Sequence, residues 1–163
     1  MKELLSIFVR GDPQPMPRAR AGIVAGHVHM YTAERYGRDD TLGRSGHKLP
    51  WLVWKEAVVR TILSQHRPAK VQGPIRLDCD FYLPRPDRLC KPGSPRGRIL
   101  HAQKPDKDNL EKLIMDALTT TEVYADDGQV CQGEPQKWYH ALGDATGARI
   151  VVTLLSDPEE GLF

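Results

Sequence analysis

The stretch "KPDKDNLEKLIMDALTTTEVYADDGQV", residues 104–130, combines the pattern of an amphipathic helix with a concentration of aspartates. Its apolar residues recur at the i, i+3, i+4, i+7 and i+8 positions that share one helix face: Leu110, Leu113, Ile114, Ala117 and Leu118. This spacing predicts a helix that packs one face against a core. The residues after it, "EVYADDGQV" (122–130), predict a turn that leads into a strand.

The aspartates flank this predicted helix on both sides. Asp106 and Asp108 alternate immediately before it, so we expect their side chains to project to the same side of the entering segment. Lys112 follows Asp108 by one helical turn and shares its face. Asp126 and Asp127 follow the helix, and the glycine after them permits a tight turn that could return one carboxylate to the helix start. The sequence therefore predicts a convergence of carboxylates.

Two interpretations of these carboxylates stay open. Two carboxylates about 5 Å apart repel by roughly 3 kcal/mol at an effective dielectric constant of about 20, and a divalent cation would offset that cost. Ligands that are all oxygen favour Mg²⁺ or Mn²⁺ over zinc. Alternatively, Asp108 and Glu111 form a capping box and the Asp-Asp-Gly turn is ordinary turn chemistry, which requires no metal.

The formal net charge of +2 conceals a strong segregation of charge. Lysine and arginine outnumber aspartate and glutamate by seven to four in residues 10–48 and by seven to two in residues 84–107. In residues 108–127 the acids outnumber the bases by six to one. Basic segments beside a carboxylate cluster suit a polyanion bound through its phosphates, although solvated loops beside a solvated turn are the plainer alternative.

The rest of the chain predicts strands, a hairpin and one further helix. A helix should begin at Pro50, because Trp51, Trp54, Val58 and Ile62 follow at helical spacing. Strict alternation predicts a half-buried strand over residues 74–84. Less regular patterns predict a strand, a hairpin and a final strand over residues 3–11, 22–32 and 148–156.

Length and composition bound the class of protein. The 163 residues suit a single domain, 1–163, with extended basic loops at about 36–48 and 84–104. The three cysteines lie far apart and form no CxxC pair, which favours a reducing compartment over a disulfide framework. No apolar run is long enough for a membrane span, so we expect a cytoplasmic protein without a membrane partner. We also expect no nucleotide cofactor.

Two secondary sites carry competing explanations. Asp78 and Asp80 share one face of the predicted strand and form a second possible ligand pair, but Arg76 lies on that face and could pair with one of them. Trp138 could stack on bases, as could Trp51 and Trp54, although the helical spacing of the last two favours core packing. Asp116, one turn beyond Lys112, is expected to form a surface ion pair.

"KPDKDNLEKLIMDAL" followed by "YADDGQV" closely resembles the signature of the RusA family of Holliday-junction resolvases. In that family an aspartate pair that opens a helix, a helix lysine and a later aspartate form the active site. The resemblance implies an α/β fold of the α+β kind, with a small mixed β-sheet packed against two main helices. Carried over by position, it also implies that Asp106, Asp108 and Asp127 bind Mg²⁺ and that Lys112 is catalytic, with Asp126 as an additional candidate ligand.

The resemblance further implies a homodimer that makes paired cuts in branched DNA. We therefore expect a Mg²⁺-dependent endonuclease that acts on four-way junctions in recombination and repair, with Mn²⁺ as a substitute. The phosphate backbone would be held by Arg18, Arg20, Lys104 and Lys107. Two alternatives stay open: a nuclease for flaps or forks, and a non-catalytic DNA-binding module with a structural acidic cluster.

Overall fold

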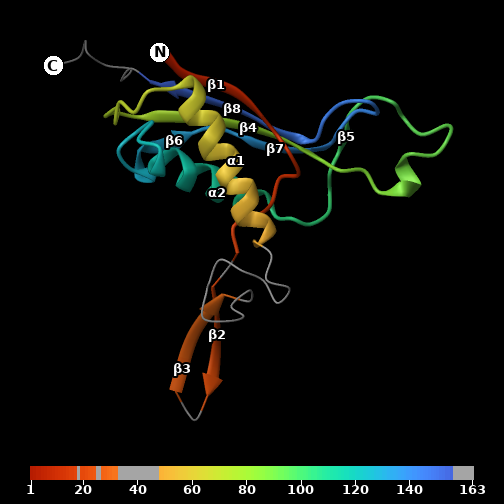
Figure 1. Cartoon of the computed structure of the whole chain (residues 1–163), viewed down its shortest axis with the longest axis horizontal. Helices are drawn as coiled ribbons and strands as arrows, with labels where there is room; N and C mark the ends of the chain where they lie inside the picture. Colours follow the sequence, from red (N-terminus) through yellow and green to blue (C-terminus); the bar gives the residue numbers. More distant parts are fainter. Residues whose placement is uncertain (18, 25–26, 33–47, 156–163) are drawn as a thin grey trace.

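The computed structural model describes residues 1–17, 19–24, 27–32 and 48–155, which form a mixed six-stranded sheet, a two-stranded hairpin and two main helices (Figure 1). The predicted α+β fold is confirmed. The elements in chain order, with η for a short 3-10 helix, are β1 (Lys2–Arg10), β2 (Ala19–Val24), β3 (His27–Thr32), α1 (Pro50–Gln65), β4 (Ile75–Leu83), η1 (Asp87–Leu89), β5 (Ile99–Leu100), α2 (Lys107–Thr120), η2 (Asp127–Gln129), β6 (Val130–Gln132), β7 (Pro135–Tyr139) and β8 (Gly147–Leu154).

The central strand of the sheet is β4. The strand order is β1-β8-β4-β7-β5; β8 runs antiparallel to β4, whereas β7 and the short β6 run parallel to it. Every second residue of β4 is buried, as its alternation predicts: Ile75, Leu77, Cys79, Phe81 and Leu83. The intervening residues lie on the opposite face of the sheet.

Both helices cover the same face of the sheet (Figure 1). Pro50 is the first residue of α1, a position where a missing N–H costs no helical hydrogen bond, and Trp54, Val58 and Ile62 are buried. All five predicted apolar residues of α2 are fully buried. Burying a side chain such as Leu or Ile contributes about 1.5–3 kcal/mol, so this stripe fixes α2 firmly against the sheet.

Two segments extend from the sheet and helices. Figure 1 shows the hairpin of β2 and β3 projecting away on the side that the helices cover. The long basic segment predicted at about 84–104 contains η1 and β5, and β5 joins the sheet by pairing with β7. The other predicted basic loop, 36–48, lies almost wholly outside the described residues. In the described part of the chain, no helix has both the length and the apolar character to cross a bilayer.

Candidate active site

The start of α2 presents two of the predicted site residues. The helix begins at Lys107, with Asp106 as the N-cap residue in an extended conformation (φ −70°, ψ 142°) and Asp108 inside the first turn. The prediction that both aspartates precede the helix was therefore wrong for Asp108. The capping box predicted as an alternative on Asp108 and Glu111 is not the helix start, and Asp106 makes no capping hydrogen bond through its side chain.

Lysines surround these two exposed aspartates. Lys112 is exposed and lies one turn beyond Asp108 on the same helix face, as predicted. Lys104 and Lys107 are exposed on either side of the N-cap residue. The positive charge of these lysines lies next to the two carboxylates, an arrangement that suits a ligand bound through its phosphates.

Further along α2, Asp116 forms the predicted surface ion pair, and its partner is Lys55 of α1. Asp116 thus holds the two helices together at their surface. On β4, Arg76 donates a hydrogen bond of 2.7 Å from Nε to Asp78, so the structure gives that aspartate the ion-pair role predicted as an alternative to metal binding.

The acidic turn after α2 is held by its own hydrogen bonds. The Asp126 carboxylate accepts a bond of 2.8 Å from the Gly128 N–H, and Oε1 of Gln129 accepts one of 2.9 Å from the Asp126 N–H, which completes a capping box. Nε2 of Gln129 also donates to the carbonyl oxygens of Val71 (3.1 Å) and Gly73 (2.8 Å). The turn is thereby fixed to the segment before β4, and Asp127 is exposed as the first residue of η2.

The structure places Asp106 and Asp108 at the start of the same helix but does not assemble the whole predicted set. Although η2 contacts α2, the described residues contain no group of three His, Cys, Asp or Glu side chains that could hold a metal ion. Mg²⁺ is commonly held by one or two carboxylates, with water and substrate phosphates as its other ligands. The carboxylate oxygens at the start of α2 therefore fit Mg²⁺, but Asp127 does not form a three-residue ligand group with them.

A proline-rich segment runs beside the start of α2. The Met16 N–H donates a bond of 2.9 Å to the carbonyl oxygen of Asn109, in the first turn of the helix. This contact places the chain that leads into the hairpin next to the two aspartates. Arg18 lies outside the described residues; the backbone of Arg20 lies in β2, paired with Tyr31.

A hollow of about 420 Å³ next to this helix start includes residues that the sequence did not single out. His101 is buried in its wall with its ring 4.4 Å from that of Tyr139, and burial, aided by the charge of Lys137, lowers the pKa of His101. The ammonium group of Lys137 donates to the carbonyl oxygens of Gln103 (2.6 Å) and Pro105 (2.7 Å), which steadies the segment that enters α2. These residues are isolated in sequence, so no spacing signal could have identified them.

Glu111 is a further acidic group near the aspartate pair. It is half-buried, and this desolvation raises its pKa; the charge of Lys107 opposes the increase and that of Asp108 adds to it. Burial thus favours the protonated form of the Glu111 carboxyl group.

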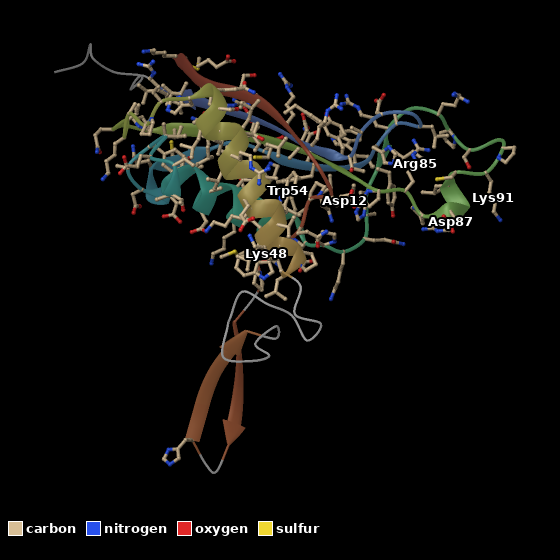
Figure 2. The ribbon with its side chains drawn as sticks, in the orientation of Figure 1. Asp12, Lys48, Trp54, Arg85, Asp87 and Lys91 are labelled. Carbon is tan, nitrogen blue, oxygen red and sulfur yellow. The ribbon has the colours of Figure 1, made fainter. Side chains whose placement is uncertain are left out.

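Arg85 organises the basic loop that leads to α2. Its guanidinium group is buried and donates to five backbone carbonyl oxygens, those of His140 (2.6 Å), Pro95 (2.6 Å), Leu89 (3.3 Å), Arg96 (3.4 Å) and Gly97. Figure 2 shows Arg85 where the loop leaves the sheet, with Asp87 and Lys91 farther out. One buried arginine thus ties the two ends of the loop together.

Comparisons with known proteins give a family match and a relative. The family model described as endodeoxyribonuclease RusA matches residues 11–154. A protein of Bacillus subtilis (strain 168), named as the uncharacterized protein YqaN, is 29% identical over 143 residues, which cover 84% of this chain and 89% of that protein. The region that the family model matches includes the proline-rich segment, both helices and the acidic turn.

Proposed function

Since the chain belongs to the RusA family of endodeoxyribonucleases, we propose that it hydrolyses phosphodiesters in four-way DNA junctions in a Mg²⁺-dependent reaction that serves recombination and repair. The observation that carries this proposal is the exposed pair Asp106 and Asp108 at the start of α2, beside the segment held by the bond from Met16 to Asn109. We place the protein in the cytoplasm and treat residues 1–163 as one nuclease domain.

Asp106 and Asp108 would hold the metal ion, with Asp127 as a third ligand. When bound, Mg²⁺, or Mn²⁺ in its place, would offset charge on the scissile phosphate and lower the pKa of a coordinated water. Because the described residues form no group of three such ligands, the participation of Asp127 requires at least one of the three carboxylates to change position. Asp126 is the less suitable ligand, since its carboxylate already accepts the bond from Gly128.

The cations around the pair would bind and orient the DNA. Lys112 projects from the same helix face as Asp108, so its ammonium group can donate to the reacting phosphate and stabilise the charge that develops there. Lys104 and Lys107 would contact flanking phosphates, and Arg18 and Arg20 would extend this contact toward the hairpin.

Symmetrical cuts on two strands require two copies of the site, and each chain supplies the aspartate pair once. We propose that the protein acts as a homodimer. Sedimentation analysis at micromolar concentration should give the mass of a dimer; a monomer that still makes paired cuts would contradict this part of the proposal.

The function is tested by incubating the protein with a four-way junction and with linear duplexes that carry the same arm sequences, in Mg²⁺ and in EDTA. We expect paired cuts near the branch point in Mg²⁺ and none in EDTA or in the duplexes. Cuts confined to flap or fork substrates would instead identify a nuclease for those structures.

The ungrouped position of Asp127 favours one competing function, a DNA-binding module whose acidic turn is only structural. Such a protein would bind the junction as tightly in EDTA as in Mg²⁺ and leave it uncut. Binding without cleavage across a range of Mg²⁺ and Mn²⁺ concentrations would select this alternative.

A further inference from the structure

The face of the sheet opposite the helices carries a row of aromatic side chains. No helix of the described residues covers this face (Figure 1). Tyr82 of β4 lies between Gly147 of β8 and Trp138 of β7 in the strand register. Phe8 of β1 lies over Gly147, where a β-carbon would come within 2.8 Å of its ring, and its ring centroid is 6.1 Å from that of Tyr82. The glycine therefore makes room for a row of three neighbouring rings.

Arg98 packs against the outermost of these rings. The guanidinium carbon of Arg98 lies 4.6 Å from the ring centroid of Trp138, and Nη1 of Arg98 donates to the Tyr82 hydroxyl at 3.5 Å. Arg85 helps to fix this position, because it binds the carbonyl oxygen of Gly97, the residue before Arg98. The arrangement is thus held by the same loop anchor described above.

A hollow of about 510 Å³ lies over the rings of Phe8 and Tyr82, and more positive than negative side chains line it. Its charged lining residues are the exposed Arg10, Arg98 and Arg149 against the exposed Asp144, and Phe8 contributes a ring that is 41% exposed. A flat exposed ring with arginines around it matches a nucleotide, which offers a base to stack and a phosphate to neutralise.

The charge of this surface argues against a second copy of the chain as its occupant. A two-fold contact places the same patch on both partners, so packing this face on itself would oppose six arginines with only two Asp144 carboxylates between them. A polyanion meets no such repulsion.

We propose that the hollow lined by Phe8, Tyr82 and the three arginines binds an unpaired DNA strand, with a base stacked on the exposed ring and phosphates held by Arg10 and Arg149. This inference deepens the proposed function and rests on it for the identity of the nucleic acid. The site is separate from the start of α2, because it lies on the other face of the sheet.

Strand β7 connects the two sites. Lys137 binds the carbonyl oxygens just before α2, whereas its neighbour Trp138 contacts Arg98 on the open face. Adjacent residues of a strand point to opposite faces, so the sites lie back to back across one strand. A single strand released near Asp106 and Asp108 could pass the edge strand β5 and reach the aromatic row.

The test measures binding of a fluorescently labelled oligothymidylate in EDTA, where no cleavage interferes. Arg10→Gln combined with Arg149→Gln should weaken binding and reduce the salt slope by about 1.4, because each lost phosphate contact on a single strand contributes about 0.7. Phe8→Leu keeps an apolar side chain but removes the ring, and should weaken binding by about 5- to 150-fold. Arg60→Gln, on the exposed surface of α1, removes a like charge from the covered face and should change neither quantity.

Each result decides the proposal separately from the cleavage reaction. Binding that is absent in the wild type, or that is the same in the double arginine variant and the wild type, overturns the strand site even if junctions are cut. A change in oligomeric state with unchanged oligothymidylate binding also overturns it and identifies a self-interface. If the wild type cuts no junction yet binding falls as expected in both variants, the strand site stands and the proposed function fails.

Discussion

Arg85→Met should loosen the basic loop and destabilise the protein. Three of the five contacts of the guanidinium group, those to His140, Pro95 and Gly97, are short, whereas those to Leu89 and Arg96 are 3.3 and 3.4 Å. A hydrogen bond from a charged donor contributes about 1.5–3 kcal/mol, so three would sum to roughly 5–9 kcal/mol if they were additive. In the variant, water can hydrogen-bond to the freed loop carbonyls and restore part of this free energy. We therefore expect the free energy of unfolding to fall by about 3 kcal/mol.

Thermal unfolding and hydrogen exchange measure the two parts of this effect. A loss of about 3 kcal/mol should lower the midpoint by roughly 6–12 °C in a chain of this size, and exchange should accelerate most in residues 87–98. Arg88→Met, an exposed residue of the same loop, is the matched control and should change little. An Arg85 variant with the wild-type midpoint and wild-type exchange in the loop would refute the assigned anchor role.

Four further outcomes follow from the site and the core. Asp127→Asn should reduce the stabilisation that Mg²⁺ gives the protein in thermal scans, whereas an unchanged Mg²⁺ shift would exclude Asp127 as a ligand. Lys112→Ala should reduce single-turnover cleavage far more than junction affinity, and an equal loss of both would make it a binding residue. The lowered pKa of His101 means that the folded protein favours the neutral imidazole. The stability that this group contributes is therefore present above its unfolded pKa of about 6.5 and is lost as the pH falls through the lower folded pKa. His101→Asn should flatten this loss in thermal melts between about pH 7 and 5, and parallel pH profiles of variant and wild type would contradict the assignment. Ile114→Ala, in the fully buried stripe of α2, should cost about 2–5 kcal/mol in denaturant unfolding, and a smaller loss would show that the core relaxes there.

Periodicity was sufficient to predict the elements whose side chains build the core. The stripe of α2 and the alternation of β4 are local patterns, and burial imposes them directly on the sequence. The strand predicted after the acidic turn is β6, whereas β5 and β7 were missed because they are short and their pairing partners are distant in sequence.

Prediction of the candidate site reached its residue types but not its assembly. Either Asp106 or Asp108 is a suitable N-cap residue, so the sequence could not decide which of them lies inside the helix. The distance from Asp127 to the pair depends on how Gln129 fixes its turn to Val71 and Gly73, a contact between segments nearly sixty residues apart. Arg85 looks like any other loop arginine, because its acceptors are backbone carbonyls that leave no mark in the sequence.

The central claim is that the carboxylates at the start of α2 carry out metal-dependent hydrolysis of branched DNA. The most direct measurement compares junction cleavage by the wild type, Asp108→Asn and Asp116→Asn under single-turnover conditions across a Mg²⁺ titration. Both substitutions neutralise one aspartate of the same helix, but Asp116 pairs with Lys55 away from the helix start. We predict that Asp108→Asn abolishes cleavage while it still binds the junction, and that Asp116→Asn cuts at close to the wild-type rate. Cleavage by Asp108→Asn at the wild-type rate and with the wild-type Mg²⁺ dependence would contradict the claim.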